Sequence, residues 1–144
     1  MRENWNYYRG DIYLVDLATG IGSEQGGCRP VLVIQNNTGN RYGPTLIVAP
    51  ISSRYQKKRH QPTHCILCDL EKLRTPSLVL AEQITTVDKS RVMKYLGRVP
   101  EEKMEPVNTA IRVSLALTAQ ETPAVPCMEK GFYGNTKSTK EGVL

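Results

Sequence analysis

Before Pro100 the chain is patterned as short apolar runs separated by residues that favour turns. β-Branched and aliphatic residues dominate these runs, and the almost continuously apolar run 31–35 is typical of a strand buried on both faces. The turn residues between the runs favour antiparallel connections over βαβ units. The predicted strands are 12–16, 31–35, 45–49 continuing through Pro50 to 51–52, 63–68 and 77–81, with 84–87 and 95–99 as edge strands.

Turns or short helical turns are predicted between these strands. Segments 37–40 and 42–44 contain asparagine, glycine and proline and are predicted to be turns. A turn or short helix is predicted at 69–73, and a helical turn at 88–91. Many short strands at close spacing, with turn residues between them, favour a small barrel. The expected fold class is therefore mainly β with helices (α+β).

One long helix is predicted after Pro100, where apolar residues recur at helical spacing among charged ones. Pro106 would interrupt a helix interior, so the regular helix should begin no earlier than about Lys103. The apolar stripe should pack on the barrel. It consists of Met104, Val107, Ile111 and Leu115.

Length and composition are those of one globular domain, with 144 residues of which 40% are hydrophobic and 23% charged. From Thr118 onward the chain is rich in proline, glycine, lysine, serine and threonine without sustained periodicity. We therefore expect one domain over 1–117 and a partly disordered tail over 118–144.

The N-terminal segment shows no apolar core followed by a small-residue cleavage site, and no later run approaches the ~18 apolar residues of a membrane span. The cysteines are too sparse and unevenly placed for a disulfide framework, so reduced thiols are the simplest interpretation. They are Cys28, Cys65, Cys68 and Cys127. An unexported cytoplasmic protein with no membrane partner is expected.

The charge balance favours a polyanionic partner without establishing one, because the net charge is +5 and the isoelectric point is near 9.1. A basic run interleaves cations with an aromatic ring on which a base could stack. Such runs are usually solvated loops, but this one follows Ser52 directly, which favours binding of an RNA backbone. The run comprises Arg54, Tyr55, Lys57, Lys58, Arg59 and His60.

The glycine-rich segment 22–30 is the candidate site for RNA cleavage. If the 2′-hydroxyl of RNA attacks the adjacent phosphate, the protein must supply a base, an acid and positive charge around the phosphorane. Gly22, Gly26 and Gly27 would let backbone approach a phosphate, and Arg29 stands at the mouth of a buried strand. Composition alone leaves open an ordinary polar loop with Arg29 in a surface ion pair.

Several ordered blocks of sequence decide between these alternatives. The blocks Arg9-Gly10-Asp11-Ile12-Tyr13, Gly22-Ser23-Glu24-Gln25-Gly26-Gly27, Arg29-Pro30-Val31-Leu32-Val33-Ile34-Gln35-Asn36 and Leu80-Ala81-Glu82-Gln83-Ile84 occur in this order. Together they resemble the MazF/PemK toxins, which are sequence-specific endoribonucleases of type II toxin–antitoxin modules. The resemblance runs from about Arg9 to Leu117.

The resemblance implies a small SH3-like β-barrel of the MazF/CcdB type with a C-terminal helix packed on it. It also implies a homodimer and a cognate antitoxin that blocks the RNA groove. The implied activity is cleavage of single-stranded mRNA without a metal or cofactor, leaving a 2′,3′-cyclic phosphate and a 5′-hydroxyl.

Three catalytic residues follow from the resemblance. The catalytic arginine corresponds to Arg29, its hydroxyl partner to Ser52, where the family commonly has threonine, and the acidic residue to Glu24. Serine keeps the hydroxyl and loses the methyl that restricts χ1. Ser53 is adjacent, and strand alternation allows only one of the two serines to face Arg29. Glu24 is either the general base or a solvated acid that repels a wrongly placed phosphate.

Further polar side chains are predicted to contact RNA. The amides of Gln35, Asn36 and Gln83 could bind base edges, although buried amides also commonly satisfy backbone groups. The predicted RNA-binding set is Ser23, Gln25, Gln35, Asn36, Arg54, Tyr55, Lys57, Lys58, Arg59, His64 and Gln83.

Three other interpretations compete with RNA cleavage. A zinc site of His60, His64, Cys65 and Cys68 is disfavoured, since one Cys-x-x-Cys is incomplete and its cysteines would project to opposite faces of a strand. A non-catalytic toxin that inhibits DNA gyrase could use the same fold, as could a nucleic-acid adaptor. A gyrase inhibitor would not need Arg29 with Ser52 and a basic loop, and an adaptor would leave RNA intact.

Overall fold

The computed structural model describes residues 6–53, 61–68, 70, 73 and 76–117. The basic run 54–60 and the tail 118–144 lie outside these residues, as does most of the turn or helix predicted at 69–73. The elements are β1 (Asp11–Asp16), β2 (Cys28–Val33), α1 (Asn37–Tyr42), β3 (Thr45–Ser52), β4 (His64–Leu67), β5 (Ser77–Leu80), η1 (Ala81–Gln83), β6 (Thr85–Asp88), η2 (Lys89–Arg91), β7 (Val92–Arg98), η3 (Glu101–Lys103) and α3 (Met104–Leu115).

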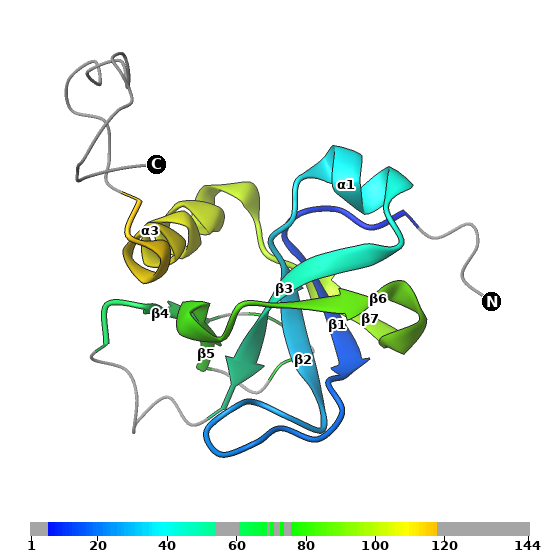
Figure 1. The fold of residues 1–144 in the computed structure, drawn as a ribbon. Helices are drawn as coiled ribbons and strands as arrows, with labels where there is room; N and C mark the ends of the chain where they lie inside the picture. The colour runs from blue at the N-terminus through cyan, green and yellow to red at the C-terminus, as the bar shows by residue number, and fades with distance from the viewer. Residues whose placement is uncertain (1–5, 54–60, 69, 71–72, 74–75, 118–144) are drawn as a thin grey trace, which may run out of the picture.

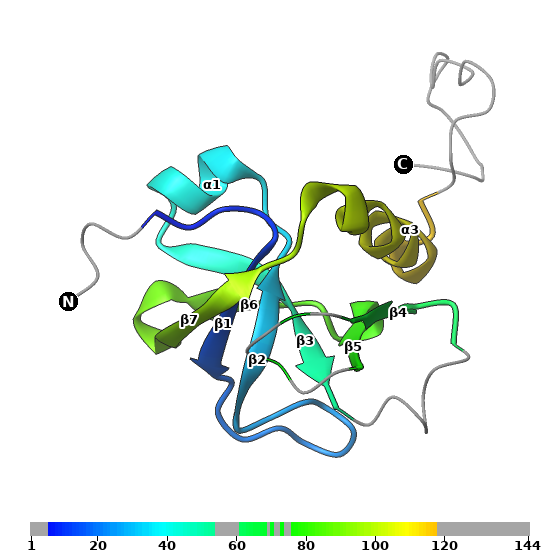
Figure 2. The same cartoon turned by 180° about the vertical axis from the view of Figure 1, so that it is seen from behind.

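The strands form one antiparallel sheet in the order β4-β5-β3-β2-β1-β7. Strand β3 has two partners along one edge, because Thr45–Val48 pair with β6 and Ile51–Ser52 pair with β5. The predicted antiparallel, mainly β fold with a C-terminal helix is confirmed (Figures 1 and 2). Among the described strands β6 and β7 are joined only through η2, so their pairings do not close the sheet into the expected barrel.

Alternating side chains of the sheet enter two separate apolar clusters. Ile12 and Leu32 pack on the side covered by α3, and Val31 and Val33 pack in the hollow of the curved sheet on the other side. All three described apolar residues of β2, 31–33, are completely buried. The prediction of a strand buried on both faces is thereby confirmed for this segment, although β2 begins at Cys28 and ends at Val33.

Helix α3 covers one face of the sheet, as predicted, but its apolar stripe differs at the C-terminal end. Met104, Val107 and Ala110 are buried, whereas Leu115 is 54% exposed. The prediction that Leu115 packs on the sheet was therefore wrong; the helix turns this residue outward near its last turn. Pro106 lies in the first turn, where its missing N–H breaks no intrahelical bond.

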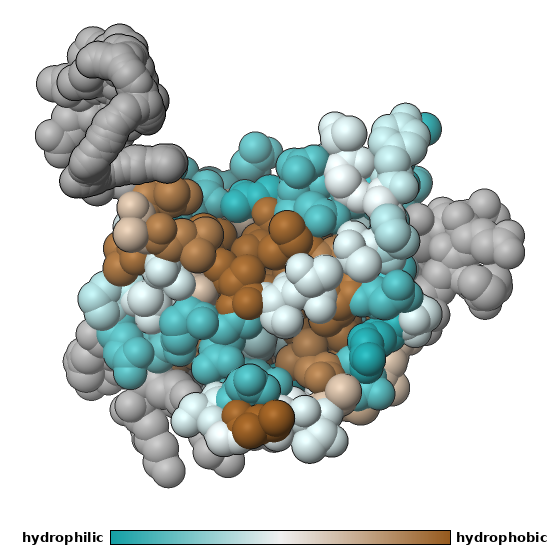
Figure 3. Space-filling view, viewed as in Figure 1, coloured by the Kyte–Doolittle hydropathy of each residue, from teal (hydrophilic) through white to brown (hydrophobic). Residues whose placement is uncertain are grey.

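The end of α3 contributes to an apolar surface. Val113, Leu115 and Leu117 are each about half exposed, and Figure 3 shows apolar side chains gathered over α3 and the middle of the same face. Within the described part of the chain, no helix is both long and apolar enough to cross a membrane.

Helix α1 was not predicted, because its sequence consists largely of turn-forming residues. Asn36 caps it by accepting a hydrogen bond from the Gly39 N–H at 2.8 Å. The Gln35 side chain donates to the Thr45 carbonyl at 3.0 Å and so joins the helix to β3. These side-chain contacts stabilise a short helix whose residues have low helix propensity.

The buried carboxylate of Asp11 ties the start of β1 to β7. Its Oδ1 accepts from Nε of Arg98 at 2.7 Å, and its Oδ2 accepts from the Tyr8 N–H and the Tyr13 hydroxyl, each at 2.9 Å. Burial, together with the charge of Asp11, raises the pKa of Tyr13 far above its ordinary value, so this hydroxyl remains a donor. One charge thus satisfies donors from three parts of the fold.

Replacing Asp11 should therefore destabilise the protein strongly. In Asp11→Ala the Tyr8 N–H and Arg98 lose this buried acceptor, and we expect a loss of about 3 kcal/mol in the free energy of unfolding. Urea denaturation followed by circular dichroism measures this. As a control, Glu105→Ala removes an exposed ion pair to Arg112, 3.4 Å long, and should cost less than about 1 kcal/mol. Equal effects of the two substitutions would contradict the role of Asp11.

Candidate active site

The two residues expected to form the catalytic pair lie on neighbouring strands. The pairing of β2 with β3 ends at Val31 and Pro50. Arg29 lies near the start of β2, two residues from Val31, and Ser52 lies at the end of β3, two residues from Pro50. Because side chains alternate along a strand, Arg29 shares its face of β2 with Val31, and Ser52 shares its face of β3 with Pro50. The two strands therefore place Arg29 and Ser52 on the same face of the sheet.

Ser52 and Ser53 differ sharply in their surroundings. Ser52 is the last residue of β3 and is 5% exposed, whereas Ser53 lies beyond the strand and is exposed. Strand alternation places Ser52 on the face that carries Arg29, whereas Ser53 is outside β3. Of the two serines, the geometry favours Ser52 as the partner of Arg29.

The β1–β2 loop is built by close contacts of its own backbone. A Cβ atom on Gly26 would lie 2.5 Å from the Gly20 nitrogen, so only glycine permits this crossing of the chain. The base of the loop is closed by hydrogen bonds from Leu17 N to Gly27 O and from Gly27 N to Ala18 O. From the sequence, the glycines are expected to let the backbone approach a phosphate. At Gly26, glycine is required because the backbone of the loop itself passes so closely.

The loop also orients Arg29, the predicted catalytic arginine. Nε of Arg29 donates to the Gly26 carbonyl at 2.9 Å, and the side chain is partly buried. This acceptor is neutral, so the charge of the guanidinium is not cancelled by it. Among the described residues the Nη groups have no hydrogen-bond partner and can meet an anion.

Glu24 lies at the turn of the same loop. Its Oε1 accepts from the Ile21 N–H at 3.0 Å, and its own N–H donates to the Ile21 carbonyl. The carboxylate therefore stabilises the turn while remaining exposed. This geometry is compatible with both interpretations of Glu24, the general base and the solvated acid.

A groove of about 390 Å³ separates the loop from η1 and β6. Glu24, Gln25 and Gln83, all predicted from the sequence, line it. Glu82 and Arg91 also line it and were missed, although Glu82 stands beside Gln83 in the block that carried the family resemblance. With two carboxylates, one guanidinium and two amides, the groove suits a polar ligand better than an apolar one. Arg29 and Ser52 are not among its lining residues.

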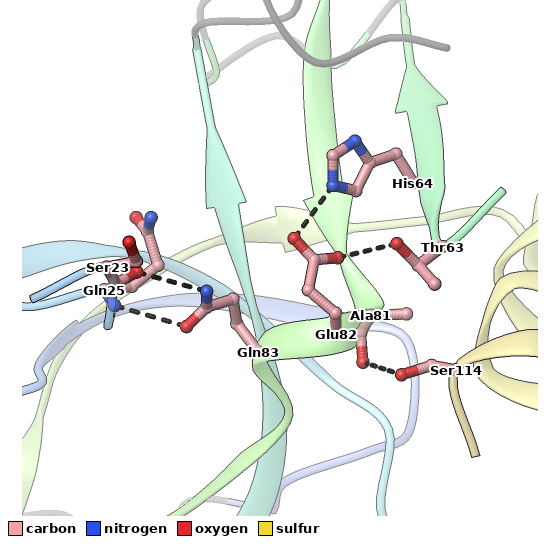
Figure 4. A network of polar contacts seen from close by, with 8 residues as sticks. All are labelled: Ser23, Gln25, Thr63, His64, Ala81, Glu82, Gln83 and Ser114. Atoms are coloured by element: carbon pink, nitrogen blue, oxygen red, sulfur yellow. Dashed lines mark hydrogen bonds and ion pairs between the residues drawn. The ribbon is translucent and has the colours of Figure 1, made fainter. Parts of the chain in front are cut away.

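Gln83 joins the loop to the rest of the protein (Figure 4). Its Oε1 accepts from the Gln25 N–H at 3.3 Å, and its Nε2 donates to the Ser23 carbonyl at 3.2 Å. Ser23 and Gln25 thus meet the predicted residue Gln83 through their backbone atoms. In this state the Gln83 amide satisfies backbone groups of the loop, which was the alternative to its binding of RNA bases.

His64 is turned inward to Glu82. Its ring nitrogen Nε2 lies 2.9 Å from Oε2 of Glu82, and the side chain is only 1% exposed. Burial alone would raise the pKa of Glu82, but hydrogen bonds, first among them that of His64 and including that of Thr63, outweigh it and lower the pKa. His64 therefore orders Glu82 and does not face the solvent as a predicted RNA contact would.

Cys65 and Cys68, which were predicted to project to opposite faces of a strand, differ in their exposure. Cys65 of β4 is buried, and burial raises the pKa of its thiol, whereas Cys68 is exposed. Among the described residues no three histidine, cysteine, aspartate or glutamate side chains converge as metal ligands would. His60 lies outside that part of the chain.

Two predicted RNA-binding amides lie far from this site. Gln35 donates to Asn40 and to the Thr45 carbonyl, and Asn36 caps α1. Helix α1 and the β1–β2 loop are at opposite ends of the sheet (Figure 1). The remaining predicted contacts lie outside the described residues: Arg54, Tyr55, Lys57, Lys58 and Arg59.

Comparison with known proteins finds the same family, and the match covers most of the chain. A family model described as "PemK-like, MazF-like toxin of type II toxin-antitoxin system" matches residues 8–115. The endoribonuclease MazF of Staphylococcus saprophyticus is 51% identical over 110 residues, which cover 76% of this chain and 91% of that protein.

Solved structures agree with the sequence comparison. A mycobacterial endoribonuclease in complex with its cognate antitoxin is 27% identical, with a TM-score of 0.66 over 78% of this chain and 98% of that chain. MazF from Deinococcus radiodurans has a TM-score of 0.66 over 79% of this chain and all of that chain, and at 23% identity it supports the fold. From its match to the family model and its identity to MazF, the chain belongs to the MazF/PemK family of toxin endoribonucleases of type II toxin–antitoxin systems.

Proposed function

We propose that this toxin cleaves single-stranded mRNA at specific sequences without a metal ion, through attack of the 2′-hydroxyl on the adjacent phosphate. The products are a 2′,3′-cyclic phosphate and a 5′-hydroxyl. The observation that carries the proposal is that the Gly26 carbonyl of the β1–β2 loop orients the guanidinium of Arg29, which shares a face of the sheet with Ser52 at the end of β3. We assign the activity to a domain over 1–117, with 118–144 as a tail.

Arg29 supplies the charge stabilisation in this mechanism. A guanidinium stays protonated at neutral pH, so it is a permanent cation that can bind the non-bridging oxygens of the phosphorane. Its Nε bond to Gly26 orients it before the substrate arrives, which avoids reorganisation during the reaction. Ser52 adds a hydroxyl donor on the same face.

Proton transfer requires a base near the 2′-hydroxyl. Glu24 is the carboxylate of the loop, and it lines the groove. We assign Glu24 as the base that takes the proton of the 2′-hydroxyl. The departing 5′-oxygen accepts a proton from the donors around Arg29. Glu24 thus belongs to the loop beside the groove, and Arg29 directly follows this loop at the start of β2.

Removal of the cation tests the proposal most directly. In Arg29→Ala, kcat for cleavage of a long RNA in EDTA should fall ~100- to 1,000-fold, because a preorganised donor to the transition state is lost. Mapping of the ends by their reactivity to kinase and phosphatase checks the chemistry. If the wild-type protein leaves RNA intact in EDTA, or if Arg29→Ala cleaves normally, the proposal is wrong.

The two adjacent serines provide a matched comparison. Ser52→Ala removes the hydroxyl on the face of Arg29 and should lower kcat by about 100-fold, while Ser53→Ala should cleave like the wild type. Ser52→Thr, which restores the residue common in the family, should retain activity. Single-turnover cleavage at saturating protein measures all three variants, and a larger defect in Ser53→Ala would reverse the assignment.

Two protein partners follow from the family. The mycobacterial relative was solved with its cognate antitoxin, and we infer that this chain likewise has an antitoxin, which would block access of RNA to the groove. We also infer a homodimer, supported by the apolar surface at Val113, Leu115 and Leu117. mRNA as substrate and an antitoxin as partner place its action in the cytoplasm.

A charge in the apolar surface should disrupt the dimer. Light scattering should give about twice the chain mass of 16.1 kDa for the wild type, and Leu115→Asp should shift the mass toward that of one chain. Because Leu115 is half exposed, the substitution should not unfold the protomer, which circular dichroism checks. A monomeric wild type, or an unaffected dimer in Leu115→Asp, would contradict the inference.

A further inference from the structure

The short helix η1 contacts three separate parts of the molecule through three consecutive residues. Ala81 accepts at its carbonyl from the Ser114 hydroxyl of α3 at 2.8 Å. Glu82 accepts from the Thr63 hydroxyl at 2.9 Å and meets His64 at the start of β4. Gln83 bonds the β1–β2 loop, so η1 lies between the helix, the edge strand and the loop (Figure 4).

The outer part of the β1–β2 loop depends on this contact. In residues 21–25 the internal bonds run between Ile21 and Glu24. Among the described residues, the hydrogen bonds that join this segment to another element are the two made by Gln83. Ile21 is 79% exposed, so apolar packing does not hold the turn either.

The side of η1 opposite the loop is rigidly supported. Ala81 is 1% exposed, and its N–H donates to the Thr63 carbonyl at 3.0 Å. The ring of His64, also 1% exposed, bonds Glu82. Gln83 therefore follows a segment that is anchored in the core. Its side chain holds the loop in a fixed position relative to that segment.

A continuous set of contacts leads from Gln83 to the catalytic arginine. Gln83 accepts from the N–H of Gln25, the next residue is Gly26, and the Gly26 carbonyl accepts from Nε of Arg29. A shift of Gln25 would move the carbonyl that orients the guanidinium. Both bonds of Gln83 lie at the long end of the usual range, so removing it should release the loop without unfolding the sheet.

We propose that Gln83 is a positioning residue, which holds the β1–β2 loop so that Arg29 is oriented for catalysis before RNA binds. The inference rests on the proposed function of Arg29. It differs from a role in base recognition, in which the Gln83 amide would contact the RNA directly. Positioning acts on kcat for every RNA sequence, whereas recognition acts on KM and on the choice of sequence.

The test uses the full-length protein with Gln83→Ala and Gln83→Glu. Gln83→Ala loses both bonds, and kcat should fall ~10- to 100-fold while KM changes less than about threefold and the cleaved sequence stays the same. Gln83→Glu keeps an acceptor for the Gln25 N–H and loses the donor to Ser23, so its kcat should lie between those of Gln83→Ala and the wild type. Fluorogenic RNAs of cognate and altered sequence separate kcat from KM.

A second measurement needs no RNA. In the free protein, ¹⁵N relaxation and amide exchange should show greater motion of the Gln25 N–H in Gln83→Ala than in the wild type. Asn108→Ala is the matched control, because its amide also joins distant elements, accepting from Arg9 at 2.7 Å, but near α1 and far from the loop. It should leave the Gln25 amide and kcat unchanged.

The outcomes distinguish the two proposals. If Gln83→Ala leaves the Gln25 amide unchanged, or raises KM and alters the cleaved sequence at constant kcat, Gln83 binds RNA and the positioning role is wrong. If the wild type does not cleave RNA in EDTA, the proposed function fails by itself. The mobility of the Gln25 amide would still report whether Gln83 holds the loop.

Discussion

The fold depends on the pairing of one strand, β3, along its full length. One edge of β3 pairs with β2, and the other edge pairs first with β6 and then with β5. The two apolar clusters lie on opposite faces of this strand, with Val48 in one and Ala49 in the other. A one-residue shift of its register would exchange these faces, so both clusters oppose it. The same alternation places Ser52 on the face of the sheet that carries Arg29, so the shared face of these two residues follows from the packing of the core.

Much of this framework could be predicted from the sequence. The strands show as apolar runs, and their turn residues indicate antiparallel connections, because burial and alternation are local properties of the chain. The exceptions have local causes too. Helix α1 has a sequence typical of turns. Asn36 caps its backbone, and the Gln35 side chain bonds the Asn40 side chain of the helix and the Thr45 carbonyl of β3. Leu115 fits a helical stripe but is 54% exposed, so the periodicity predicted more packing than the fold supplies.

The candidate site could be predicted only in part, for a physical reason. The resemblance assigns Arg29, which lies in one of the sequence blocks, and Ser52, which lies at the end of the third strand, and both assignments stay predictions. The roles of the amides depend on partners distant in sequence, since Gln83 bonds a loop 58 and 60 residues away. No periodicity reports such a contact. The same holds for Glu82, whose surroundings and lowered pKa are determined by His64 and Thr63 of another strand.

Arg29, like Arg9 and Arg91, is held by neutral acceptors, in contrast to Arg98 and Arg112. Arg98 bonds the Asp11 carboxylate, and Arg112 meets Glu105, so the charge of each is compensated within the protein. Arg29 is oriented instead by a backbone carbonyl, which fixes direction without adding a negative charge. A carboxylate at that position would compete with a phosphate for the guanidinium and repel it, whereas a neutral acceptor leaves the full charge to the ligand. The amide of Gln83 likewise holds the loop that provides this acceptor without adding a charge, and it does so beside the groove.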